Sequence, residues 1–355
     1  MFLVLSIALT AILLSLVHPI VVAMSTPADA VSGTVTYLTI CFIGIPFITS
    51  YNIISSIFRG LGDSKSPMCF IATACAANIA LDYLFMGVLH LGPAGAALGT
   101  TLSQAISVVV SLTVILKRRS IVLKKSDFKP CRAVMGKILG IGIPIAFQDG
   151  LIQVAFIIIT IIANQRGLND AAAVGIVEKV ISFLFLVPSS MLSTVSALGA
   201  QNIGAGKPER AIQTLRYAVM LAAGFGVLAS IAIQFTAEGI VSLFTDPSTA
   251  DGAAVVRFGG QYLRGYIFDC IFAGIHFSFS GFFCACRKSG LSFLHNILAI
   301  VLMRVPGVYV TSKLFPATLL PMGLATAAGS LLSVVICLIA FGVIRRKSTL
   351  VLVEE

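Results

Sequence analysis

The chain has 355 residues, of which 58% are apolar and 11% charged, with a formal net charge of +10 and a mean hydropathy of +1.03. Soluble proteins carry about a quarter charged residues, so this composition excludes soluble enzymes, nucleic-acid-binding proteins, disordered chains and secreted disulfide scaffolds. We therefore predict an integral membrane protein.

Ten apolar runs reach the length of about 20 residues that a membrane-spanning helix needs. They are continuous, whereas the strands of a membrane barrel alternate between apolar and polar residues. The sequence therefore predicts an all-α polytopic helical bundle. The predicted spans are 1–24, 34–57, 68–88, 93–116, 138–163, 171–200, 218–238, 258–284, 290–311 and 320–344.

Four prolines interrupt the predicted spans. Proline removes one helical hydrogen bond and clashes with the preceding turn, so each is expected to kink its helix. These prolines are Pro46, Pro144, Pro188 and Pro306.

Basic residues concentrate in alternate loops. The densest cluster lies in the polar segment 118–137, and most of the 24 basic residues fall on the same predicted side. By the positive-inside rule this side is cytoplasmic. We expect a multi-pass protein of the plasma (cytoplasmic) membrane with both termini in the cytoplasm.

The two halves of the sequence contain an internal repeat. An offset of 225 residues places Tyr37 on Tyr262 and Phe58 on Phe283, and a cytoplasmic polar turn follows in both halves. Spans one to four match spans seven to ten in the same direction, which predicts a parallel repeat about an axis normal to the membrane. Spans five and six have no partner upstream.

Several short segments follow one another at characteristic spacings, namely 59–63, Asn78 with 81–82, 95–97, 142–144 and 197–206. Their order and spacing resemble the multidrug and toxic compound extrusion (MATE) family. The resemblance implies two lobes of six helices, so the first two of twelve spans would be absent here, as in a truncated reading frame or in a natural ten-span variant. We expect an amino-terminal lobe of four spans at 1–117, a basic cytoplasmic linker at 118–137, a six-span carboxy-terminal lobe at 138–347 and a cytoplasmic tail at 348–355.

Ionisable residues inside spans are functional candidates because burying a charge in the membrane is costly. Asp149 lies near the middle of span five, and Asp269 lies in span eight. The family has acidic residues in these two helices, so the resemblance implies that both carboxylates bind the coupling cation, with Gln148 as a further oxygen ligand. Glu178 and His276 are reserve members of this site.

Other interpretations of these polar residues stay open. Glu178 or Asp269 could instead pair with Arg304 or Lys179 to neutralise charge. Asn78 and Asp82 share a helix face at i, i+4 and are either proton or substrate contacts or interfacial hydrogen-bonding groups.

The resemblance implies a secondary active antiporter that exports organic, cationic compounds in exchange for Na⁺ or H⁺. No catalytic constellation or metal-ligand cluster is recognisable, and none of the four histidines has a histidine partner on its own helix. We expect no enzymatic activity, no cofactor and no nucleic-acid partner. The expected partners of the monomer are a small organic substrate and membrane lipid. The alternatives are a lipid-linked oligosaccharide flippase of the same superfold, or a non-functional truncated fragment.

Overall fold

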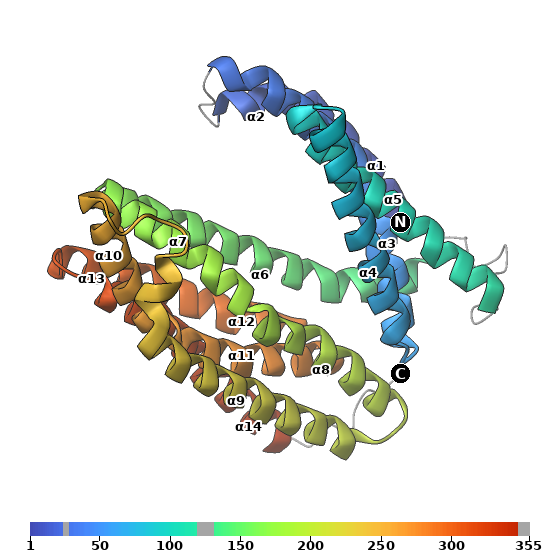
Figure 1. The fold of residues 1–355 in the computed structure, drawn as a ribbon. Coiled ribbons are helices and arrows are strands. Elements are labelled where there is room, and N and C mark those ends of the chain that lie inside the picture. Colours follow the sequence, from blue (N-terminus) through green and yellow to red (C-terminus); the bar gives the residue numbers. More distant parts are fainter. Residues whose placement is uncertain (24–27, 119–130, 347–355) are drawn as a thin grey trace. The chain divides into compact units, whose positions relative to one another are not determined.

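The computed structural model describes residues 1–23, 28–118 and 131–346, and these residues form helices and turns without any strand. The chain divides into two compact units, Met1–Met135 and Gly136–Glu355 (Figure 1). The prediction of an all-α bundle is confirmed.

The amino-terminal unit is built around one long helix. This helix, α3 (Ala28–Gly60), packs against α1 (Phe2–Ser15), α2 (Val17–Ala23) and α5 (Gly92–Arg118). Helix α4 (Lys65–Asp82) packs on α5 and continues into the π-helical turn η1 (Tyr83–Val88). Phe58 and Phe70 meet edge to face in the core of this unit, with ring centroids 5.5 Å apart.

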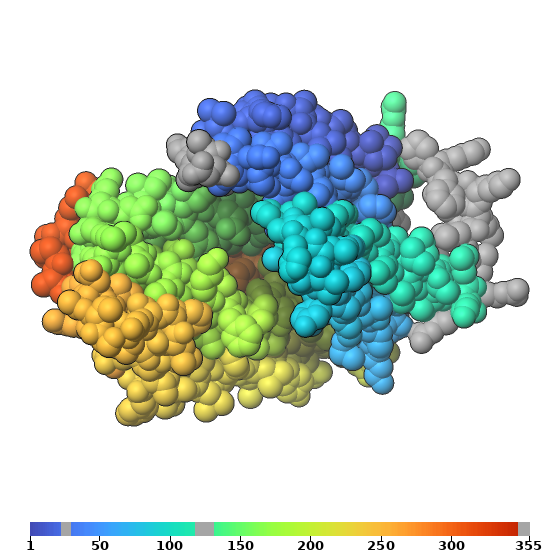
Figure 2. All heavy atoms as spheres, turned by 45° about the horizontal axis from the view of Figure 1, so that its top comes forward, coloured from blue at the N-terminus to red at the C-terminus, as the bar shows by residue number. Residues whose placement is uncertain are grey.

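The carboxy-terminal unit is built around two consecutive buried helices, α10 and α11. Helix α11 contacts α8, α9 and α14, and α10 contacts α7, α9 and α14. In Figure 2, side chains of α6, α7 and α9, coloured green to yellow, cover one face of this unit. Its elements are α6 (Arg132–Asn164), α7 (Leu168–Leu184), α8 (Leu186–Gly204), α9 (Pro208–Val241), α10 (Ala250–Tyr266), α11 (Phe268–Ala285), α12 (Ser289–Ala299), η3 (Ile300–Arg304), α13 (Val305–Leu314) and α14 (Leu320–Arg346).

Nine helical segments of the described chain are long and apolar enough to cross a membrane. The predicted first span differs, because it breaks at Leu16 into the short helices α1 and α2. Pro19 has no N–H to donate to the carbonyl four residues earlier, at Ser15, so it favours a break at this position. The other predicted spans each coincide with one of the nine segments.

Two of the predicted kink points show how the bundle compensates for proline. Pro46 lies inside α3, and the carbonyl that it leaves free, at Phe42, accepts a hydrogen bond from Thr10 Oγ1 at 3.1 Å. Pro144 lies inside α6, where Ser289 Oγ donates to the carbonyl four residues before the proline at 3.2 Å. Hydroxyls of neighbouring helices therefore satisfy backbone groups that have no access to water inside a membrane.

The internal repeat extends to the backbone conformation of its turns. Gly62, after α3, has φ of +87°, and Arg287, 225 residues later, has φ of +57°. In both turns the next residue donates its N–H to the carbonyl five residues earlier, at 2.9 Å for Asp63 and 2.7 Å for Lys288. This is the closing hydrogen bond of a helix that ends in a left-handed residue. The repeated sequence thus forms the same turn twice.

Candidate functional site

A buried ion pair lies at the centre of the carboxy-terminal unit. Asp269, at the start of α11, is fully buried, and its Oδ2 accepts a hydrogen bond from Arg304 Nη2 at 2.5 Å. The same nitrogen donates to Ser330 Oγ on α14 at 3.1 Å. Of the interpretations left open by the sequence, pairing of Asp269 with Arg304 is therefore the one observed.

This ion pair does not satisfy all the polar atoms around it. Asp269 Oδ1 and the Tyr266 hydroxyl are both buried and have no hydrogen-bond partner among the described residues. A buried carboxylate oxygen without a partner costs free energy. A proton or a cation at this oxygen would reduce that cost.

Glu178 belongs to the same polar region. It lies on α7 and its Oε1 accepts a hydrogen bond from Thr160 Oγ1 of α6 at 3.3 Å. Both Tyr262 and Tyr266 lie within electrostatic range of Glu178 and of Asp269. Two carboxylates from α7 and α11 therefore act on one pair of buried tyrosines.

Asp149 and Gln148 occupy different environments, although they are neighbours in sequence. Gln148 is fully buried and its Oε1 accepts a hydrogen bond from Ser292 Oγ at 2.6 Å. Asp149 is exposed on the surface of α6, because consecutive helical residues do not face the same side. The structure does not bring Asp149 together with the buried Asp269.

Two histidines meet near the ion pair, although they lie on different helices. The rings of His276 on α11 and His295 on α12 are 5.6 Å apart in an edge-to-face arrangement. His295 is held between Ser280 Oγ at 2.8 Å and Ser333 Oγ at 2.5 Å. Sequence reasoning missed this pair because it considered histidines only within one helix.

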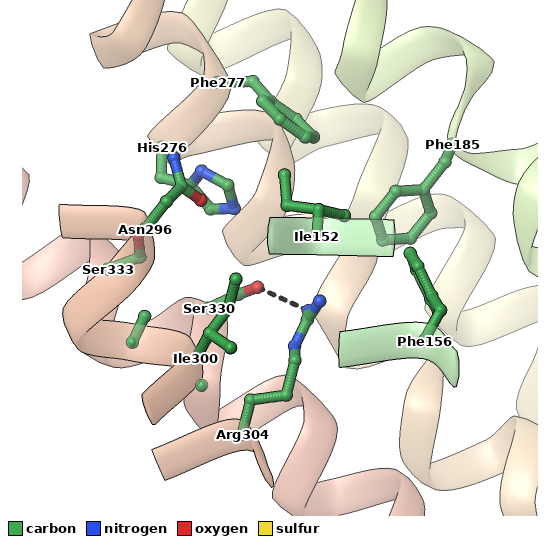
Figure 3. Close-up of a pocket in the computed structure, with 12 residues that line it drawn as sticks. Ile152, Phe156, Phe185, His276, Phe277, Asn296, Ile300, Arg304, Ser330 and Ser333 are labelled. Atoms are coloured by element: carbon green, nitrogen blue, oxygen red, sulfur yellow. Dashed lines mark hydrogen bonds between the residues drawn. The ribbon is translucent and has the colours of Figure 1, made fainter. Parts of the chain in front are cut away.

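A cavity of about 60 Å³ opens beside these residues (Figure 3). The Arg304 side chain points into it, and Arg304 is the charged member of the lining. Most of the remaining wall is aromatic or aliphatic. The lining residues are Ile152, Phe156, Phe185, His276, Phe277, Asn296, Ala299, Ile300, Arg304, Gly329, Ser330 and Ser333.

The amino-terminal unit has a polar cavity of its own, of about 250 Å³. Asn78 Nδ2, Asp82 Oδ1 and the Tyr51 hydroxyl are buried there or close by, without hydrogen-bond partners among the described residues. The Asp82 carboxylate packs directly against Gly99, where a Cβ atom would overlap it. The cavity is lined by Tyr51, Ile71, Ala74, Cys75, Asn78, Thr100, Ser103 and Gln104.

The described residues contain no group of three or more histidine, cysteine or acidic side chains that could hold a metal ion of the transition series or zinc. The polar groups instead lie singly or in pairs inside apolar helical bundles. These features define a multi-pass α-helical membrane protein built on an internal repeat.

The chain belongs to the MatE family, because the profile of that family matches residues 1–84 and 144–310. It is similar to the "Probable multidrug resistance protein YpnP" of Bacillus subtilis (strain 168), with 30% identity over 86% of this chain and 66% of the relative. It is also similar to the "FAD transporter" of Shewanella oneidensis, with 27% identity over 76% of this chain and 60% of the relative. The chain thus spans less than two thirds of the length of these curated relatives.

The fold is also that of solved transporters. A MOP superfamily transporter from Pyrococcus furiosus superposes with a TM-score of 0.90 and 20% identity, over 98% of this chain and 77% of the other. For that transporter, reverse polarity of the binding pocket has been taken to suggest a different function. At this identity the likeness establishes the fold alone.

Proposed function

We propose that this protein is a secondary active antiporter that exports organic compounds in exchange for Na⁺ or H⁺. The observation that carries the proposal is the fully buried Asp269 carboxylate, which has one oxygen without a partner inside a MatE-family bundle. A carboxylate that is removed from water is driven toward neutralisation by a proton or a cation.

The coupling cation would bind in the region shared by Asp269, Glu178 and Tyr266. Carboxylate and hydroxyl oxygens are the ligands that hard cations prefer, and Asp269 Oδ1 and the Tyr266 hydroxyl are unpartnered within the described residues. Binding there would compete with Arg304 for the Asp269 carboxylate. Occupancy by the cation would thereby alter the contacts between α11, η3 and α14.

Asp149 and Asp82 have separate roles in this proposal. Asp149 is exposed on the carboxy-terminal unit and would be available to a cationic substrate, the substrate class implied by the family resemblance. Asp82 and Asn78 would provide a second proton or substrate contact in the amino-terminal unit.

The names of the relatives favour export of organic compounds, since one is called a multidrug resistance protein and another a FAD transporter. A flippase for lipid-linked sugars would need a chamber rich in arginine and lysine to hold a polyanionic headgroup. The cavity of the carboxy-terminal unit has Arg304 as its charged lining residue and a volume of about 60 Å³. These properties favour the exporter over the flippase.

The remaining features of the proposal follow from the sequence. The protein would act as a monomer in the plasma membrane, with both termini in the cytoplasm, and would need no cofactor and no nucleic acid. It would have no enzymatic activity, because its proposed function is to couple the transport of an organic compound to the transport of a cation.

Transport by the full chain in proteoliposomes with an imposed Na⁺ or pH gradient tests this proposal. Asp269→Asn and Glu178→Gln should each reduce gradient-driven ethidium efflux by roughly tenfold or more, because each removes a charge from the coupling region. The control is Glu238→Gln, which removes the half-exposed partner of Arg264 at the surface. Gradient-driven efflux that persists in both site variants would refute the proposed coupling site.

A further inference from the structure

Arg304 has more hydrogen-bond donors than the protein uses. A guanidinium group carries five N–H donors, and in Arg304 only Nη2 is engaged, by Asp269 and Ser330. Nε and Nη1 donate to no acceptor among the described residues, although 90% of the side chain is buried. Neither nitrogen is among the fully enclosed atoms without a partner, so the acceptor that each lacks within the described residues can come from outside the protein.

The missing acceptor would lie in the cavity, because the guanidinium group points into it (Figure 3). Asp269 pairs with Arg304 but is not among the lining residues, and neither Glu178 nor any other acidic residue lines the cavity. A group inside the cavity therefore meets the cation without an intervening carboxylate. His276 and Asn296 supply further polar contacts in the wall.

The size and walls of the cavity restrict the ligand further. A volume of about 60 Å³ accommodates a small charged group, whereas pockets for whole drug-sized molecules measure about 300–1,000 Å³. Phe156, Phe185 and Phe277 line the same cavity as the guanidinium group and give it aromatic walls. Aromatic walls beside a guanidinium group favour a ring system that carries an oxyanion, since arginine N–H groups donate charge-assisted hydrogen bonds to carboxylate and phosphate.

We propose that the cavity of the carboxy-terminal unit binds the carboxylate or phosphate group of an aromatic organic anion, with Arg304 as its anchor. This inference rests on the proposed transport function and adds to it a binding site for an anionic group, separate from the contact for a cationic substrate at Asp149. The anion would accept a hydrogen bond from Nε or from Nη1, while Nη2 retains its contacts with Asp269 and Ser330.

Binding of riboflavin and riboflavin 5′-phosphate to the purified full chain tests the inference, because these probes share one fluorescent ring system and differ by a phosphate group. The phosphorylated probe should bind roughly tenfold or more tightly than riboflavin, the difference that one charge-assisted interaction supplies. Inorganic phosphate should compete only weakly, because it lacks the ring. Ethidium, an aromatic cation, should not displace the phosphorylated probe.

Variants assign the effect to Arg304. Arg304→Gln alone leaves Asp269 buried and unpaired and could unfold the unit, so the decisive variant is Arg304→Gln combined with Asp269→Asn. This double variant should bind both flavins equally, whereas Asp269→Asn alone should keep the preference for the phosphate. The matched control is Arg264→Gln, which removes an arginine paired with Glu238 outside the cavity and should leave the preference unchanged.

Equal binding of the two flavins by the unsubstituted chain would overturn the inference, as would a phosphate preference that survives in the double variant. Binding is measured without a gradient and does not require coupling. A transporter that moves ethidium in a gradient but shows no phosphate preference would refute this inference alone. Arg304-dependent binding without gradient-driven transport would instead refute the proposed function.

Discussion

At the scale of single residues, equivalent positions of the internal repeat share one backbone conformation although their side chains differ. Gly62 and Arg287 both adopt positive φ at equivalent turns. Glycine reaches this region without steric cost, but a side chain brings Cβ close to a carbonyl oxygen and costs roughly 1–2 kcal/mol. The second turn therefore stores strain that the first turn avoids.

Arg287→Gly should stabilise the carboxy-terminal unit by about 1 kcal/mol, because it relieves this strain and leaves the closing hydrogen bond of Lys288 intact. Unfolding of the purified chain by denaturant in detergent micelles measures the change. The reciprocal substitution Gly62→Arg should destabilise the chain by a similar amount. A loss of stability in Arg287→Gly would show that contacts of the arginine outweigh the strain of its backbone.

The candidate site was only partly predictable from its residues. Burial of Asp269 and its pairing with Arg304 follow from the cost of charge inside a span. The contact between His276 and His295 does not follow, because it depends on how α11 and α12 pack. The sequence predicts that Gln148 and Asp149 face different sides of their helix, since consecutive helical residues do not face each other. It does not predict which of the two side chains is buried in the core.

At the scale of elements, small residues determine how closely α10 and α14 approach. A Cβ atom on Gly265 would lie 2.6 Å from the carbonyl oxygen of Leu320, and one on Gly323 would lie 2.7 Å from the Tyr266 nitrogen. The two backbones therefore touch where these glycines face each other, as small residues permit in membrane bundles. This crossing supports the segment that carries Tyr262 and Tyr266.

Gly323→Ala should destabilise the chain by roughly 1–3 kcal/mol, because the added methyl group forces α14 away from α10. Gly342→Ala is the matched control on the same helix, since a Cβ atom there meets nothing within 4 Å. That control should be neutral or more stable by about 0.5–1 kcal/mol, the helix-propensity gain of alanine over glycine. Denaturant unfolding measures both variants, and equal stabilities would show that α14 shifts without cost.

Element boundaries were predictable where proline acts locally, and less so elsewhere. Pro19 accounts for the break of the first predicted span, although apolar length alone indicated one continuous helix. The helical segment from Ala250 to Ala285 also breaks, at Ile267 between α10 and α11, without any proline. Ile267 is fully buried at this break, and no proline marks the position in the sequence.

At the scale of the whole molecule, charge at helix ends predicts how the chain is oriented in the membrane. Arg59 ends α3, Arg118 ends α5, and Arg345 with Arg346 ends α14. Basic residues are favourable at helix C-termini and resist translocation across the membrane. Because α5 and α14 occupy equivalent places in the repeat, their basic ends should lie on the same side.

We therefore predict that Cys131, exposed directly before α6, lies in the cytoplasm within the basic segment 118–137. A chain with Cys131 as its only cysteine, the others being replaced by alanine, should resist a membrane-impermeant maleimide in intact cells and react after lysis. Ser248→Cys in the same background tests the opposite side, because residue 248 lies in the loop between α9 and α10. It should react in intact cells, since helix α9 carries the chain across the membrane from its basic first turns near Arg210. Labelling of Cys131 from outside, with protection of residue 248, would reverse the predicted orientation.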